Sequence, residues 1–350
     1  MGTTHGQHEA PRRELLPGVT RRAVVLVVGV LLLQLGFVLS YVGAFHAPTP
    51  RGVPLAVVAP AGAPAGTAEQ VAGRLGALDG DPLDTRVAAT EAAARGLLTD
   101  REVDGVLLVG PGTEDTLLVA GAEGGAVSSA LTEVLTRVEA AQQRTVTTDD
   151  VVPAGESDAR GLSAFYLAVG WVVGGYLVAS IIGVSAGSRP PTRARGAVRL
   201  ASLAVYAVVS GVGGALITGP VLGVFDGHLL ALAALGALLV LAVGAFTTAL
   251  QVWTGLVGIG LAILLFVVLG NPSAGGAYPA PLLPPFWAAI GPWLPPGAGT
   301  DAVRGIVHFG GAGVGQACLV LAGYAVVGVL ATLAGAGRGA AAAEPVPVAG

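Results

Sequence analysis

One stretch of this sequence, residues 229–270, runs for 42 residues without a charged side chain. A straight α-helix of that length would reach about 63 Å, roughly twice the ~30 Å hydrocarbon core of a bilayer. The stretch must therefore double back, and its least apolar part, residues 247–255, is the expected hairpin. Only 11% of the 350 residues are charged and the mean hydropathy is +0.75. Such a chain cannot cover its surface with polar groups in water, which predicts an integral membrane protein.

Six apolar segments are long enough to cross a bilayer. Four arginines precede the first segment, which also suits the start of a signal peptide. We favour an uncleaved anchor, because the run exceeds the ~7–15 residues of a signal core and no clear cleavage site follows. The expected transmembrane helices cover residues 23–45, 162–186, 198–222, 229–250, 253–270 and 313–336.

Arginine is distributed unequally around these segments, and all 18 basic residues are Arg. The N-terminal tail (1–22), the loop between the second and third helices and the C-terminal end together carry nine arginines and three acids, whereas residues 46–160 carry 17 acids and 8 arginines. Cytoplasmic loops are enriched in basic residues. We therefore expect both termini in the cytoplasm and residues 46–160 outside. The Ala/Gly/Val-rich, lysine-free composition suggests a GC-rich bacterial genome, and we expect the protein in the bacterial cytoplasmic membrane.

Residues 46–160 alternate short apolar runs with amphipathic segments, a pattern that predicts a compact α/β domain. Its acidity is that of a solvated surface or, alternatively, a means of attracting cations or substrate. The predicted fold class is an α-helical polytopic membrane protein with six transmembrane helices. An extracytoplasmic α/β domain is inserted between helices 1 and 2, and residues 161–350 form the membrane domain.

Residues 271–304 hold eight prolines and four aromatics between two apolar runs. Proline cannot continue a helix, and irregular backbone cannot face lipid. We therefore expect residues 271–312, here called the cap, to form short proline-bounded helices at the outer interface, where Trp287 and Trp293 suit the headgroup zone. The cap is either a rigid anchor or the closure of a pathway. Asp301 precedes Arg304 by three residues, a spacing that allows an ion pair on a helix.

The sequence lacks the motifs of common catalytic sites. No H-E-x-x-H or G-x-S-x-G occurs, a Walker A lysine is missing, and Cys318 is the single cysteine. We expect no enzyme activity, cofactor, metal or nucleic-acid partner. The spans also lack charged residues in their interiors, which argues against built-in ion coupling. The glycine-rich pieces "GVGGAL" and "GAGVGQ" are expected inside spans, where they allow close helix packing.

One anchor, an outer α/β domain and five further spans resemble the type-2 ABC exporter permeases (ABC-2 type), and the chain looks most like the branch of phage-infection-protein-like membrane proteins. Two local motifs carry the resemblance, "LGNPSAGGAYP" and the Leu-Pro-Pro-Gly segment before the last span. The Asn-rich turn common after the family's first outer strand is absent. The resemblance implies a permease that pairs with a separate cytoplasmic ATPase, as a homo- or heterodimer among membrane lipids, and exports a lipophilic or cell-surface substrate.

Two sets of residues follow as candidate sites. The outer cap or gate comprises Asn271, Pro272, Ser273, Gly275, Gly276, Trp287, Trp293, Leu294, Pro295, Pro296, Gly297 and Arg304. The candidate surface for coupling to the ATPase comprises Arg189, Arg193, Arg195 and Arg199. The alternative to a transporter is a membrane scaffold or receptor whose outer domain binds a partner of the cell envelope or the secretion machinery.

Overall fold

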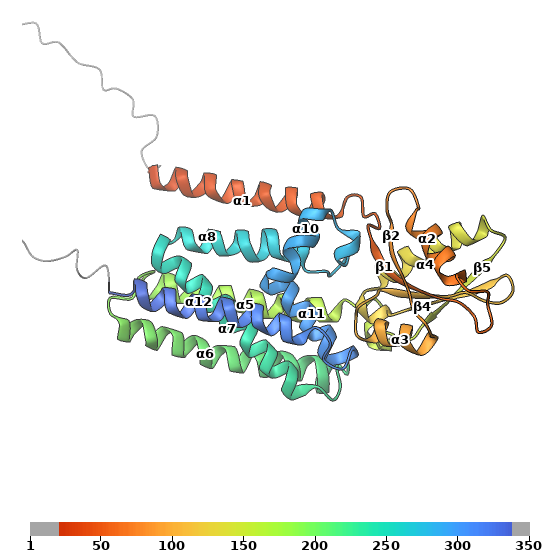
Figure 1. Ribbon diagram of the computed structural model, residues 1–350. Coiled ribbons are helices and arrows are strands. Elements are labelled where there is room, and N and C mark those ends of the chain that lie inside the picture. Colours follow the sequence, from red (N-terminus) through yellow and green to blue (C-terminus); the bar gives the residue numbers. More distant parts are fainter. Residues whose placement is uncertain (1–20, 338–350) are drawn as a thin grey trace, which may run out of the picture.

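The computed structural model describes residues 21–337, with only the backbone of Arg21 and Arg22, as a helical bundle joined to a sheet domain (Figure 1). Within this range five helices are long and apolar enough to cross a membrane. They are α1 (Arg21–Phe45), α5 (Ser163–Ser185), α6 (Arg193–Leu216), α7 (Leu229–Thr254) and α12 (Val314–Gly335). Of the expected tail, residues 1–22, the first 20 lie outside the described residues, as does the end of the chain after residue 337.

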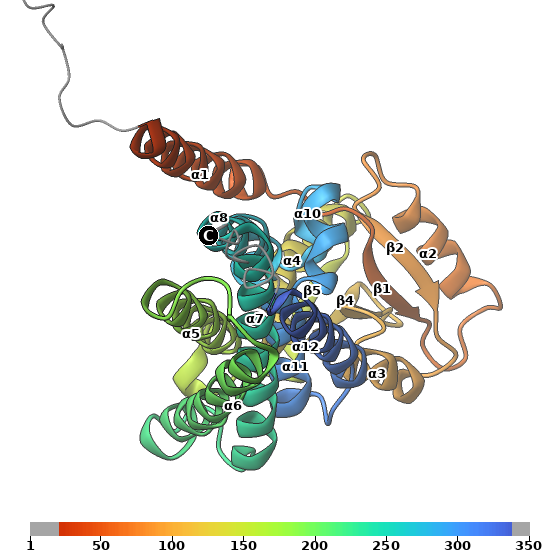
Figure 2. The same cartoon turned by 90° about the vertical axis from the view of Figure 1, so that its left-hand side faces the viewer.

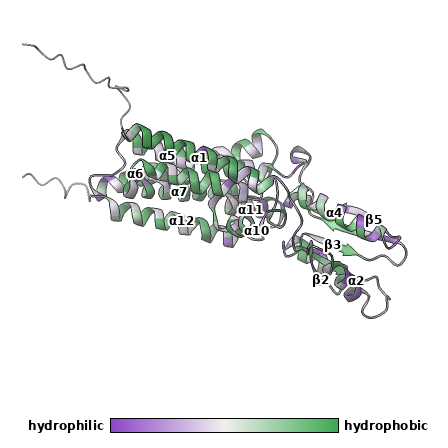
Figure 3. Ribbon diagram, turned by 90° about the horizontal axis from the view of Figure 1, so that it is seen from above, coloured by the Kyte–Doolittle hydropathy of each residue, from purple (hydrophilic) through white to green (hydrophobic). Residues whose placement is uncertain are grey.

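Hydrophobic residues run the length of the bundle, and hydrophilic residues gather on the sheet domain (Figure 3). Most side chains of α1 are exposed, and this helix stands beside α8 at the margin of the bundle (Figure 1). A water-soluble bundle would hide these side chains. The apolar helices therefore agree with a membrane-embedded protein.

Helix α7 is the centre of the bundle and contacts α5, α6 and α12 (Figure 2). Glycine permits each close approach: a Cβ at Gly211 would collide with the α7 backbone, one at Gly328 would lie 2.5 Å from Ala245 C, and one at Gly175 would lie 2.9 Å from Val240 O. Small residues let apolar helices pack backbone against backbone in a membrane. This is the role expected for "GVGGAL", which begins at Gly211.

The other glycine-rich piece, "GAGVGQ", was expected inside a span but begins in a turn. Gly311 and Gly313 have φ angles of 99° and 78°, a left-handed conformation that glycine adopts without strain. Helix α12 starts only after this turn, at Val314.

The helix expected over residues 229–250 extends to Thr254, and the sixth expected span, residues 253–270, is a shorter apolar helical segment that is not among the five long helices. The polar residues expected at the hairpin lie inside α7. The helix accommodates them because Thr247 and Thr248 donate hydrogen bonds to backbone carbonyls one turn earlier, and Gln251 donates to Ala179 O of α5. The chain turns at Gly255, the last residue of the expected hairpin, with φ 68°. The return segment, Val257–Ser273, comprises α8 (Val257–Ile263), a π-helical stretch (Leu264–Leu269) and α9 (Gly270–Ser273).

The segment between α1 and α5 folds around a five-stranded sheet with strand order β2-β1-β3-β4-β5. β3 and β4 form an antiparallel hairpin, and the other neighbouring strands are parallel. This sheet domain was expected from the alternation of strand and helix patterns. Its strands are β1 (Val53–Val58), β2 (Leu83–Val87), β3 (Gly105–Leu108), β4 (Glu114–Val119) and β5 (Thr145–Asp150), and its helices are α2 (Thr67–Gly76), α3 (Glu91–Thr99) and α4 (Gly125–Ala140).

The sheet has a hydrophobic core on each face. Leu55 and Leu107 point to one side with residues of α2 and α4, whereas Ala56 and Val106 point to the other side with Leu98 of α3. This is the two-residue alternation of a pleated strand buried on both faces.

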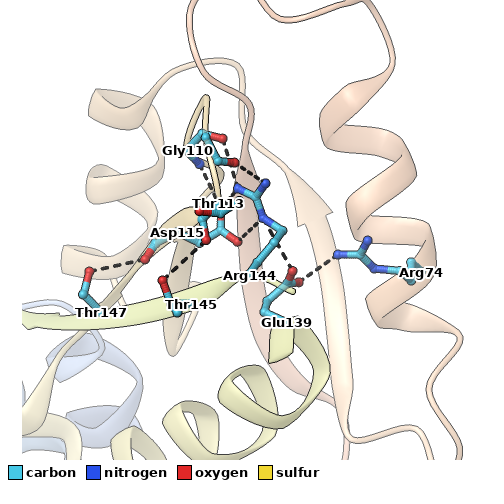
Figure 4. Close-up of polar contacts among 9 residues, drawn as sticks. Arg74, Gly110, Thr113, Asp115, Glu139, Arg144, Thr145 and Thr147 are labelled. Atoms are coloured by element: carbon cyan, nitrogen blue, oxygen red, sulfur yellow. Dashed lines mark hydrogen bonds and ion pairs between the residues drawn. The ribbon is translucent and has the colours of Figure 1, made fainter. Parts of the chain in front are cut away.

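A buried polar cluster ties the start of β4 and β5 to α2 and α4 (Figure 4). Arg144 binds Asp115 through two nitrogens and also donates to the carbonyl oxygens of Gly110 and Gly112. Glu139 accepts from Arg74 at 2.8 Å and lies 3.8 Å from Arg144 Nε. Both carboxylates are only 1% exposed, so their cations are needed to offset desolvation.

We predict that Arg144→Ala destabilises the full-length protein by about 2–4 kcal/mol, because it leaves Asp115 buried without a cation. The matched control is Arg137→Ala, whose ion pair with Glu133 is 72% exposed on both sides. That exposed pair is worth no more than about 0.5 kcal/mol. Thermal unfolding in detergent, followed by circular dichroism, measures both. Equal shifts for the two variants would contradict the structural role of the cluster.

Candidate functional site

The cap folds into short helices whose starts are set by proline. Pro285 opens α10 (Pro285–Ile290), and Pro295 and Pro296 occupy the first two positions of α11 (Pro295–His308). Proline suits the first helical turn because the amide hydrogen it lacks would have no partner there. The cap is thus an ordered stack of helical pieces packed on α5, α7 and α12.

Most of the cap residues singled out from the sequence are buried where backbone segments cross. A Cβ on Gly297 would collide with the carbonyl of Gly291, and one on Gly276 would lie 2.5 Å from the Phe165 ring. The motif glycines are therefore needed for close approach. Buried with them are Pro272, Ser273, Leu294, Pro295, Pro296 and Arg304.

The remaining members of this set are less buried. Trp293 is 63% exposed, and Trp287, Asn271 and Gly275 are half-buried. Asn271 interacts with the Tyr41 side chain of α1.

The cap enters both hydrophobic cores of the sheet domain. Leu282 and Tyr278 join the core that contains α2 and α4, whereas Phe309 and Ala312 join the core that contains α3. The backbone adds a hydrogen bond of 3.0 Å from Arg51 N to the carbonyl of Pro281. The sheet domain is therefore fastened to the cap from both faces of its sheet.

The expected ion pair between Asp301 and Arg304 is absent, and each side chain binds elsewhere. Arg304 is 1% exposed and donates to the carbonyl of Gly275 at 2.9 Å. Asp301 Oδ1 instead lies 3.3 Å from Nη2 of Arg101, a residue of the sheet domain. The spacing allowed this pair, but helix spacing takes no account of a partner 200 residues away in the sequence, whose guanidinium contacts α11.

Arg101 is the centre of the charged contact between the two parts. It makes two hydrogen bonds to Glu123, of 2.8 and 2.6 Å, and a third of 3.2 Å to the carbonyl of Asp301. Its guanidinium carbon lies 5.3 Å from the centre of the Phe309 ring, within the range of a cation–π contact. No signal in the sequence identified Arg101 or Glu123, since neither can be distinguished by sequence from the other charged residues of the domain surface.

A cavity of about 290 Å³, here called the junction pocket, opens beside Arg101. Both parts of the molecule line it, with Asp100, Asp104 and Glu123 from the sheet domain and Asp301 and Gln316 from the bundle. Within residues 21–337, no group of three or more His, Cys, Asp or Glu side chains is arranged to hold a metal ion. The pocket is thus a polar cavity with excess negative charge.

The pocket changes the acidity of its carboxyl groups in opposite directions. Burial and, to a smaller extent, the negative charge of Glu123 raise the pKa of Asp104 from 3.8 to about 7, although the charge of Arg101 opposes the shift. Burial also disfavours the charge of Glu123, but the charge and hydrogen bonds of Arg101 outweigh it and lower the pKa of that carboxyl. At neutral pH, Glu123 is held ionised by Arg101, while Asp104 titrates.

We predict that Asp104→Asn raises the thermal midpoint at pH 8. Because the pKa of Asp104 is higher in the folded state, this carboxyl lowers stability progressively as the pH rises from about 4 to 7. The variant should gain roughly 1–2 kcal/mol at pH 8, a modest value because Asp104 is only half-buried. The gain should shrink at pH 5. A variant less stable than wild type at pH 8 would contradict the assigned pKa.

The four arginines of the candidate coupling surface divide into two kinds. Arg189 donates to the carbonyls of Val252 and Trp253 at the end of α7, and Arg199 is buried and donates to those of Gly187 and Ser188. These two shape the loop before α6.

Arg193 and Arg195 differ from them because both are exposed in the first turn of α6, where the Thr192 hydroxyl caps the helix. They are the two members of the set that are available to a partner.

No protein-family model matches this chain, and neither a curated protein nor a solved structure matches it.

Proposed function

We propose that this chain is the membrane permease of a type-2 ABC exporter, which moves a lipophilic or cell-surface substrate with energy from a separate cytoplasmic ATPase. The observation that carries the proposal is the absence of Asp, Glu, Lys and Arg from the described spans except at their ends. Transporters that couple to ions use ionisable groups inside the membrane. A transporter without them draws its energy from a partner subunit.

The position of the cap supports six membrane crossings. The sheet domain follows α1 and contacts the cap, so both belong on one side of the membrane. Arg189 ties the loop before α6 to the far end of α7, which belongs on the other side. Val257–Ser273 then has to return the chain to the cap. Its 17 residues span about 26 Å, and local thinning of a ~30 Å bilayer accommodates the difference.

The arginine distribution supports one orientation of the chain in the membrane. The loop with Arg193 and Arg195 lies in the cytoplasm of a bacterial cell, with both termini, and the acidic sheet domain lies outside. In this arrangement, the two exposed arginines are available to a cytoplasmic ATPase. Two copies of the permease, or this chain and a related one, enclose the transport pathway among membrane lipids.

We predict that the permease, purified gently from its native membranes, carries ATPase activity supplied by the partner. The chain itself has no Walker lysine and contributes none. The double variant Arg193→Glu with Arg195→Glu should lose at least about 80% of this activity, because the reversed charges would repel the acidic partner surface that the two arginines are proposed to bind. The control reverses Arg86 and Arg137, two exposed arginines of the sheet domain, and should retain full activity.

The absence of ATPase activity from wild-type preparations would contradict the transporter and favour the alternative of a scaffold or receptor. Activity that survives the double variant would leave the transporter in place but remove Arg193 and Arg195 from its coupling surface.

A further inference from the structure

An apolar groove on the side of the bundle adjoins the junction pocket. This groove, here called the membrane groove, has a volume of about 590 Å³ and is lined by Trp293 of the cap and by Leu319, Gly323 and Tyr324 of α12. Gln316 lines both cavities. The two cavities are therefore neighbours at the first turn of α12. The polar cavity lies toward the sheet domain, and the apolar one lies along a helix long and apolar enough to span a membrane.

The junction pocket favours a positively charged occupant. Arg101 is its one basic lining residue and is already engaged by Glu123 and Asp301. Asp100 and Asp104 also line the pocket, and neither has an ion-pair partner among residues 21–337. Uncompensated carboxylates in a partly enclosed cavity attract cations more strongly than they would in water.

We propose that the pocket and the groove form one binding site for a lipid-like amphiphile with a cationic amine headgroup. The amine lies in the junction pocket near Asp100 and Asp104, and the hydrocarbon chain lies in the membrane groove against Trp293 and Tyr324. This inference deepens the proposed export function, on which it rests, by naming its substrate class.

The dimensions and position of the two cavities agree with such a ligand. Small-molecule sites have volumes of about 300–1,000 Å³, and the pocket and groove together fall in this range. The groove is open on the side that faces lipid, since Leu319 is 76% exposed. The hydrocarbon chain of a ligand can therefore enter the groove directly from the membrane. The headgroup then decides which amphiphile is retained.

The test measures binding to the full-length protein in nanodiscs of phosphatidylcholine. The probe is a sixteen-carbon alkylamine with a nitroxide in mid-chain, which quenches the fluorescence of nearby tryptophan. The comparison probe has the same chain and ends in a hydroxyl group. At pH 8 the Asp104 carboxyl, with its pKa of about 7, is ionised, whereas an alkylamine is still protonated. We expect the amine probe to reach half-maximal quenching at a concentration at least about tenfold lower than the hydroxyl probe. Most of this saturable quenching should be lost in Trp293→Phe.

Two pairs of variants separate the pocket from the groove. Gly323→Leu fills the groove without strain, because no heavy atom lies within 4 Å of the added Cβ, and should weaken both probes. Gly315→Leu is the matched control on the same helix, equally unobstructed and outside both cavities. Asp104→Asn should weaken the amine about tenfold and leave the hydroxyl probe unchanged. Asp84→Asn, an exposed acid on β2, should change neither.

Equal quenching by amine and hydroxyl probes, or an amine affinity that Asp104→Asn leaves intact, would overturn the proposal by showing a groove that accepts any lipid. Displacement of the probe by butylamine as readily as by hexadecylamine would also overturn it, since the pocket would then act without the groove. These outcomes are independent of the export function. A protein that binds the alkylamine as described but carries no ATPase activity would retain the site and lose the exporter.

Discussion

The cap packs into the two hydrophobic cores of the sheet domain, and the arrangement of the whole chain depends on this contact. Leu282 enters one face and Phe309 the other, so the sheet cannot move relative to the cap without exposing apolar surface on one side. The contact also decides which ends of the helices lie together. It places the segments after α1 and after α9 at the same end of the bundle.

Buried charge makes this contact specific. Arg304 is almost fully buried and donates to a cap carbonyl, while Arg101 joins Glu123 of the sheet domain to Asp301 of α11. A buried ion pair adds little to stability beyond the desolvation that it offsets, but removal of one partner leaves an unpaired charge. The charges therefore disfavour any other seating of the sheet domain. They also line the junction pocket, a polar cavity that both parts of the molecule share.

The parts of the fold that depend on local pattern could be predicted, and those that depend on distant contacts could not. Apolar runs predicted the long helices, and alternating patterns predicted the sheet domain. The turn after α7 falls at the last residue of the expected hairpin, because Thr247 and Gln251 form their hydrogen bonds within the bundle and a hydropathy count does not reveal this. The junction pocket was missed for a similar reason: it requires Arg101 and Asp301 to meet across 200 residues of chain.

Hydrogen exchange of the full-length protein tests the fastening of the cap to the sheet domain most directly. The account predicts that amides of α11 exchange as slowly as those of β1 and β3. Phe309→Ala should accelerate exchange in α3 and β3 at least about tenfold, because it opens the core that Phe309 completes. Phe286→Ala, an exposed ring of the cap, should leave both unchanged. Unaltered exchange in α3 and β3 of Phe309→Ala would contradict the account, because the sheet domain would then be stable without the cap.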